Sequence, residues 1–251
     1  MNTKKTQPII KGHTPYGLIK VTKLIKQKHI LVKMGKKKRE FVLVLGAHSD
    51  DFVIGAGGTI AEYSREGKRV LCVVFSYGEL SHPWMKKEEV VKIREEEAHK
   101  AGKVLGCRVK YFGLKDQGVY EDYKNKGIEN KLLELIKKNK PTKVFTHSIE
   151  DPHPDHRAVH KITKEIYAQI SGKKPELYVY SIWNPVSIKT SWPKMYVDIT
   201  KSFSKKLKAL KEYPSQRFQA IYPLMVFVFW RAFKNGLKIR KRMAETFYRV
   251  K

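Results

Sequence analysis

A short apolar segment that ends in ionisable side chains constrains this chain more than any other feature. Residues 41–45 are consecutive apolar residues between a glutamate and a glycine, which is typical of a β-strand buried on both faces. His48, Asp50 and Asp51 follow, and we expect the glycine-rich segment after them to be a turn. Burying a histidine beside two carboxylates is unfavourable unless a positive charge lies among them. The segment therefore predicts a ligand site at the carboxyl edge of a sheet, with a metal ion as that charge.

The middle of the chain predicts strands that alternate with helices. After the first strand we expect a helix that begins at Gly57 or Gly58 and is closed by Gly67. Further strands are predicted at 69–75, 109–112, 144–146 and 176–181, and further helices at 85–105, 127–139 and 155–170. Residues 113–125 are predicted to be a loop. The alternation indicates an α/β fold with a mainly parallel sheet and helices on both faces.

The two ends of the chain differ from this middle region. Residues 1–39 are predicted to be a basic arm with an amphipathic helix at about 17–33. Residues 40–251 are predicted to be one domain with a helical C-terminal extension from about residue 201. Within it we expect a helix at 201–212 and one or two helices over 216–247.

The net charge of +28 lies almost entirely at the ends. Residues 1–39 and 201–251 each carry +12, which leaves +4 for the region between them. A basic surface favours anionic partners, either acidic lipid headgroups or nucleic acid. The arm could lie on an anionic membrane surface, or it could be a solvated or packed helix, and the sequence leaves both open.

The compartment is predicted from cysteine use and hydropathy. Cys72 and Cys107 form no CxxC motif and are expected to be reduced thiols. No signal peptide is predicted, and the apolar run 220–230 is shorter than the ~20 residues that span a bilayer. We expect a cytoplasmic protein, with peripheral attachment to the inner face of the membrane left open by the basic ends.

A second cluster of ionisable residues follows the predicted strand at 144–146. It contains His153, Asp155 and His156. A catalytic zinc commonly has three protein ligands from imidazole and carboxylate groups. The spacing of His48 and Asp51 allows one tight turn to bring both to a single ion, with His156 as the third ligand. Zinc is the expected cofactor, and another divalent metal ion is left open.

The remaining members of both clusters suggest catalytic roles. Asp50 lies beside a ligand and is predicted to be the general base that takes a proton from water. His153 is predicted to stabilise an oxyanion or to protonate a leaving amine. Asp155 is predicted to fix the orientation of an imidazole. His147 and His82 are expected to support the site or to contact substrate.

Both clusters resemble the motifs of a known family. The segments AHSDDFVIGAGGTIA and HSIEDPHPDHRAV are similar to the motifs (A/P)HPDDE and HxDH of the PIG-L/LmbE family of zinc-dependent N-acetylglucosamine deacetylases. The similarity continues through IREEEAHKAGKVLG, GLKDQG and VDITKSFSKKLKALKEYPSQ to AETF, so it covers residues 40–247.

This resemblance implies a Rossmann-like three-layer fold and hydrolysis of the acetamide of an N-acetylglucosamine conjugate. It implies His48, Asp51 and His156 as metal ligands, Asp50 as the base and His153 as its electrostatic partner. It adds Arg94 and Asp116 as substrate-binding residues. Two positions depart from the family pattern. Ser49 stands where the family has proline, and Phe52 stands where it has glutamate.

The predicted function is therefore removal of an acetyl group from an N-acetylglucosamine conjugate, with a lipid-linked sugar as one candidate. The alternative is a non-enzymatic protein that binds nucleic acid on a deacetylase-like scaffold, which the intact set of ionisable residues does not favour. A dinucleotide site is not favoured, because the GxGxxG spacing fails at Ile60, and the chain has no P-loop and no GxSxG motif.

Overall fold

The structure is a computed structural model, and it describes residues 39–184 and 192–250. The helix predicted at 17–33 lies outside the described residues. The division into an arm and a catalytic domain at residue 40 stays a prediction. Cys72 and Cys107 are free thiols with their sulfur atoms 3.6 Å apart.

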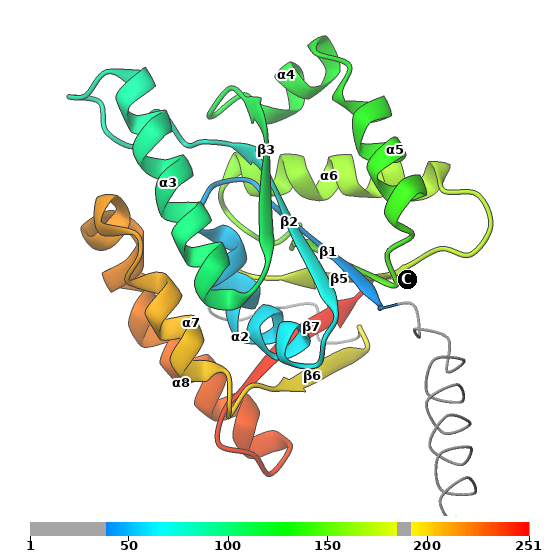
Figure 1. The fold of residues 1–251 in the computed structure, drawn as a ribbon, viewed down its shortest axis with the longest axis vertical. Coiled ribbons are helices and arrows are strands. Elements are labelled where there is room, and N and C mark those ends of the chain that lie inside the picture. The colour runs from blue at the N-terminus through cyan, green and yellow to red at the C-terminus, as the bar shows by residue number, and fades with distance from the viewer. Residues whose placement is uncertain (1–38, 185–191, 251) are drawn as a thin grey trace, which may run out of the picture. The chain divides into compact units, whose positions relative to one another are not determined.

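A seven-stranded sheet organises the described residues, in the order β3-β2-β1-β4-β5-β7-β6 (Figure 1). The first five strands in the chain are parallel, whereas β7 runs antiparallel to both of its neighbours. The strands are β1 (Phe41–Gly46), β2 (Arg69–Ser76), β3 (Arg108–Leu114), β4 (Lys143–His147), β5 (Glu176–Tyr180), β6 (Lys194–Asp198) and β7 (Ala244–Arg249). The predicted mainly parallel sheet is confirmed.

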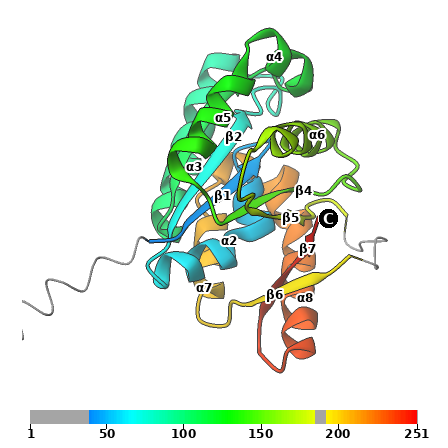
Figure 2. The ribbon, with the colours of Figure 1, turned by 90° about the vertical axis from the view of Figure 1, so that its right-hand side faces the viewer.

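Helices cover both faces of this sheet, as alternation along β1 shows. The helices lie on the two sides of the sheet (Figure 2). Val42 and Val44 pack in one core with α2, α3, α7 and α8, while Leu43 and Leu45 pack in a second core with α4, α5 and α6. The helices are α2 (Asp51–Arg65), α3 (Lys87–Leu105), α4 (Val119–Asn125), α5 (Ile128–Asn139), α6 (Pro154–Gln169), α7 (Phe203–Leu210) and α8 (Tyr222–Lys238), with short 3₁₀ and π turns at Pro214–Gln216 and Arg217–Ile221. The three-layer prediction is confirmed.

Helix α2 begins earlier than the sequence suggested. It begins at Asp51, and the glycines assigned to a turn lie inside it. A Cβ added at Gly55 would lie 2.3 Å from the ring of Tyr180, and one at Gly58 would lie 2.6 Å from Ile199. The glycines therefore serve close packing of α2 against the sheet and the segment before α7, and this outweighs their low helix propensity.

The close approach at Gly55 predicts a stability effect. Tyr180 is buried and its hydroxyl donates a hydrogen bond to the Leu45 carbonyl oxygen at 2.7 Å, so its ring cannot move aside. Overpacking of this kind costs about 1–3 kcal/mol, which exceeds the helix-propensity gain of about 1 kcal/mol for alanine. We expect Gly55→Ala to lower the free energy of unfolding in urea. Gly118→Ala, where the added Cβ comes no nearer than 3.6 Å to Lys115, should change it by less than about 1 kcal/mol.

Two segments near the ends of predicted elements were assigned wrongly. Residues 119–125 form helix α4 rather than a loop, because Val119 and Tyr123 are buried in the second core. The region 216–247 is not helical throughout, since β7 begins at Ala244. Glu245 of β7 accepts hydrogen bonds from the backbone N–H groups of Gly58 and Thr59. These long-range contacts, absent from the local pattern, stabilise β7 between β5 and β6.

Candidate functional site

The predicted site residues follow the carboxyl ends of the parallel strands β1, β3 and β4, except for Arg94, which lies on α3. Because these ends meet at one edge of the sheet, the loops that follow them converge. They form a pocket of about 200 Å³ together with residues of the segment that precedes α8. All predicted site residues except Asp155 line this pocket, namely His48, Asp50, Asp51, Arg94, Asp116, His153 and His156.

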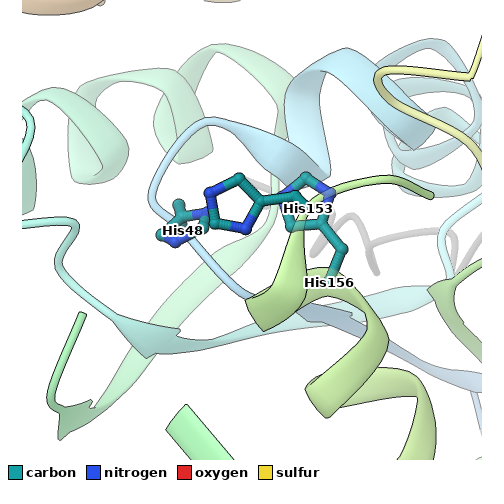
Figure 3. Close-up of side chains that lie close together, drawn as sticks. All are labelled: His48, His153 and His156. Carbon is teal, nitrogen blue, oxygen red and sulfur yellow. The ribbon is translucent and has the colours of Figure 1, made fainter. Parts of the chain in front are cut away.

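The three predicted metal ligands lie next to one another. Asp51 Oδ2 is 3.7 Å from His48 Nδ1, and Asp51 Oδ1 is 3.3 Å from His156 Nε2. The ring centroids of His48 and His156 are 5.4 Å apart, and His153 lies beside both rings (Figure 3). The two sequence clusters, over a hundred residues apart, therefore meet.

Several carboxylates surround His48. Its Nε2 lies 3.2 Å from Asp116 Oδ1 and 3.4 Å from Asp155 Oδ2. Burial lowers the pKa of His48, but the contacts with Asp116 and Asp155 and the charge of Asp51 outweigh it and raise the pKa to about 10. The environment of this imidazole thus strongly favours a positive charge, which a proton or a metal ion can supply.

The surroundings of His156 and Asp51 favour the charged form of each side chain. His156 Nδ1 lies 2.9 Å from Asp151 Oδ1 on the side away from Asp51. Burial lowers the pKa of His156, whereas Asp51 and Asp151 raise it to about 9. Burial raises the pKa of Asp51, but the charge of His156 and the contacts with His156 and His147 hold it well below its usual range. The buried carboxylates therefore stay ionised and need a cation among them.

The donor set fits a divalent metal ion. Three groups of side chains in the described residues could each hold one, namely His48 with His153 and His156, Asp51 with His147 and His156, and His48 with Asp116 and Asp155. The predicted ligands contribute to every group, although His48 and Asp51 do not share one. Imidazole nitrogen and carboxylate oxygen at a buried, anionic position are the donors that zinc prefers.

His147 supports the site from behind. Its Nε2 accepts a hydrogen bond from the Ala47 N–H at 3.0 Å and lies 3.1 Å from Asp51 Oδ2. Burial lowers the pKa of His147 to about 4, and the nearby charge of His156 adds to this effect. Its Nε2 lone pair is therefore engaged by the backbone of the loop after β1, which agrees with the supporting role that we predicted.

Asp50 is held by a buried ion pair. Arg94 Nη2 donates to Asp50 Oδ1 at 3.1 Å, and both side chains are buried. The pair fixes the carboxylate at the wall of the pocket, where the predicted general base must lie. Arg94 also lines the pocket, so its contact with substrate stays a prediction, but its first role in this structure is to orient Asp50.

Both carboxylate oxygens of Asp116 also have partners within the protein. Besides its contact with His48, its Oδ2 accepts a hydrogen bond from the backbone N–H of Leu80 at 3.1 Å. It too lines the pocket, and its predicted contact with substrate stays untested.

His153 and Asp155 begin helix α6 and have different surroundings. His153 Nδ1 accepts a hydrogen bond from the Asp155 N–H at 3.2 Å, so in the neutral ring the proton lies on Nε2. Burial lowers the pKa of His153, and the charges of His48 and His156 lower it further. Asp155 accepts from the N–H groups of Gln117 and Val119 and does not line the pocket. We therefore treat it as a residue that positions His48, not as a catalytic one.

Comparison with known proteins identifies the family. A family model described as GlcNAc-PI de-N-acetylase matches residues 43–167, a segment that contains both clusters. A 4-oxalmesaconate hydratase of Pseudomonas putida is 32% identical over 188 residues, which are 67% of this chain and 71% of the relative. The chain belongs to the PIG-L family. The resemblance inferred from the motifs is thereby confirmed.

Two deacetylases extend the comparison across more of the PIG-L domain. The diacetylchitobiose deacetylase of Thermococcus kodakarensis is 26% identical over 217 residues, which are 79% of this chain and 76% of the relative. A structure of N,N′-diacetylchitobiose deacetylase from Pyrococcus horikoshii has a TM-score of 0.70 at 24% identity and covers 96% of this chain and 95% of that chain. The latter likeness concerns the fold.

The two departures from the PIG-L pattern have structural explanations. Ser49 Oγ donates a hydrogen bond to the Tyr77 carbonyl oxygen and accepts one from the Tyr111 hydroxyl at 3.0 Å, contacts that a proline could not make. Phe52 is fully buried in the first core. Neither residue displaces a predicted ligand from the pocket.

Asp151 is a contributor whose role the sequence did not reveal. Asp155, which we predict to orient an imidazole, lies 3.4 Å from His48 Nε2. The carboxylate that contacts His156 Nδ1 is instead Asp151, which also accepts a hydrogen bond from the His153 N–H. Its Oδ2 accepts two more from the N–H groups of Ile182 and Trp183, beyond β5. The only indication in the sequence is that Asp151 lies between the predicted strand at 144–146 and the segment His153–His156.

This placement predicts the effect of Asp151→Asn. An amide in place of the carboxylate removes the charge behind His156, and partners of this kind typically contribute 10–100-fold to metal affinity or activity. We expect a weaker metal affinity by about that factor, measured by chelator competition. An affinity equal to that of the wild type would show that Asp151 does not act through His156.

Proposed function

We propose that this PIG-L protein is a metal-dependent hydrolase that removes the acetyl group from an N-acetylglucosamine conjugate, releasing acetate and a free amine. The observation that carries the proposal is the meeting of His48, Asp50, Asp51 and His156 at the wall of one pocket. The name of the matched family and the diacetylchitobiose deacetylase among the relatives supply the substrate class.

We assign the metal to His48, Asp51 and His156, with zinc as the expected ion. When bound, a divalent ion supplies polarisation of the acetamide carbonyl and lowers the pKa of a water molecule. The buried carboxylates behind the ligands, Asp116 and Asp151, keep both imidazoles in place and compensate the charge of the ion.

Asp50 is the general base in this proposal, and His153 is the hydrogen-bond donor to the oxyanion. Asp50, held by Arg94, takes a proton from the water that attacks the acetamide carbon. The Nε2–H of His153 can donate a hydrogen bond to the developing oxyanion, and the proton that Asp50 took from water can pass to the glucosamine nitrogen as the C–N bond breaks. The pairing of a base with a donor on another loop is what hydrolysis of an amide requires.

A substrate screen tests this proposal. Acetate release should be measured with and without added zinc on N-acetylglucosamine joined to inositol phospholipid, to another lipid, to a nucleotide and to a second sugar. We expect metal-dependent release from at least one conjugate. Release from none of them, by a metal-loaded and folded protein, would contradict the proposal.

A second reaction deserves the same test because one relative is named a hydratase. That relative is 32% identical to this chain, a higher identity than the 26% of the chitobiose deacetylase. A metal ion and a base also suit the addition of water to an unsaturated carboxylate. Loss of the ultraviolet absorbance of such a substrate, without acetate release, would favour hydration.

Nucleic-acid binding without catalysis is the remaining alternative. A salt-dependent gel shift at physiological ionic strength, together with absence of metal binding by the purified chain, would support it. The buried ion pair of Asp50 with Arg94 has no evident use in such a protein.

A further inference from the structure

Helix α8 lies at the periphery of the described fold (Figure 1), and several of its large apolar side chains are exposed. We call the exposed residues on one face of this helix the α8 stripe, which consists of Tyr222, Val226, Phe229, Trp230, Phe233 and Leu237. Their three- and four-residue spacing places them on one side of the helix. Val226 is 71% exposed and Leu237 is 60% exposed. The opposite side, with Leu224, Val228 and Ala232, packs into the first core.

The size of this stripe calls for an explanation. Contiguous exposed apolar patches usually mark sites that contact a protein, a ligand or a membrane. The neighbouring turn adds Phe218, which is 79% exposed and whose ring lies 5.5 Å from that of Tyr222. None of the helices in the described residues is long and apolar enough to cross a membrane.

The charge around the stripe favours an anionic partner. Between Glu212 and Glu245 the chain has seven basic residues and no acidic one. Among them, Lys234 and Lys238 lie on α8 and are exposed beside the stripe. An apolar helix face flanked by lysines is typical of helices that lie in the headgroup region of anionic membranes. A second copy of this chain would bring two basic surfaces together, and nucleic acid would leave the stripe exposed to water.

The turn that precedes the stripe contributes to the wall of the pocket. Gln219 and Ala220, in the turn between Phe218 and Tyr222, line the pocket. Trp183, on a different segment, lines it too and is 38% exposed. A surface that binds the stripe would therefore also be close to this pocket.

We propose that the α8 stripe and Phe218 dock this protein on an anionic lipid bilayer, so that the pocket opens toward substrate held in the membrane. The choice of substrate rests on the proposed function, whereas docking is measured without turnover. Failure of docking and failure of deacetylation are therefore distinguishable.

Sedimentation of the full chain with vesicles tests docking. Phosphatidylcholine vesicles with phosphatidylserine should recover the wild type, and vesicles without it should recover less. Val226→Gln/Phe233→Gln replaces exposed side chains, so it should fold normally and its recovery should fall about tenfold or more. Lys234→Glu/Lys238→Glu should also fall, because it reverses the charge beside the stripe.

Matched controls lie on other surfaces. Ile93→Gln removes an exposed apolar residue among glutamates of α3, and Lys137→Glu/Lys138→Glu makes the same charge change on α5, across the sheet. Both should bind vesicles like the wild type. All variants retain the basic N-terminal segment, so any vesicle binding through that segment is the same in each of them. Equal vesicle binding by the wild type and the stripe variants would therefore overturn the proposal. Light scattering tests whether the stripe instead binds a second copy of the chain. If the wild type is a dimer, and Val226→Gln/Phe233→Gln is a monomer that binds vesicles like the wild type, the stripe is a dimer interface and the proposal is overturned.

Discussion

Asp50→Asn should retain the metal and lose nearly all turnover. A positioned general base contributes about 10²–10⁴-fold, so we expect kcat to fall by that factor while KM changes little. The asparagine oxygen can still accept the hydrogen bond from Arg94, so the pocket should keep its shape. The measurement is steady-state acetate release by protein whose metal content has been determined.

The control for Asp50→Asn is Glu134→Gln, the same carboxylate-to-amide change at an exposed position on α5. It should leave kcat unaltered. Near-normal turnover by Asp50→Asn would reject the base assignment. Loss of the metal in that variant would instead make Asp50 a ligand.

His156→Ala should lose the metal itself. His156 belongs to two of the three groups that could hold an ion, and its removal leaves only His48 with Asp116 and Asp155. We expect the metal content after dialysis, measured by elemental analysis, to fall to background. A second readout needs no activity: a ligand at 100 times its Kd stabilises the folded state by about 2.7 kcal/mol, so added zinc should raise the Tm of the wild type and not of the variant.

The matched control for His156→Ala is His99→Ala, which removes an exposed imidazole on α3. It should bind metal like the wild type. Normal metal content in His156→Ala would contradict the ligand set and would indicate the group around Asp116 instead.

The parts of the site that the sequence predicted are those set by local pattern. The segments 41–45 and 144–146, predicted to be strands, are strands, and a cluster of ionisable residues follows each one. Because β1 and β4 are parallel neighbours, their carboxyl ends bring His48 and His156 together. Burial of polar groups at a strand end is unfavourable without a partner, which is why the pattern alone indicated a cation.

Other features depended on contacts between distant segments. The residues around Gly55 do not indicate that it lies inside helix α2. A glycine is needed there because the ring of Tyr180 on β5 packs against the helix at that position. Strand β7 resembles the end of a helix in sequence, but it forms between β5 and β6. The stripe on α8 could be recognised as apolar, yet only the packing of its opposite side showed which residues remain exposed.

The sequence by itself determined the layered α/β architecture of the middle region, the two clusters and their donor types, because strand burial and ligand chemistry depend on neighbouring residues. The tertiary structure decided which carboxylate stands behind which imidazole, with Asp151 at His156 and with Asp116 and Asp155 at His48. Those pairings depend on how separate loops fold over one sheet edge, and residue spacing does not encode that geometry.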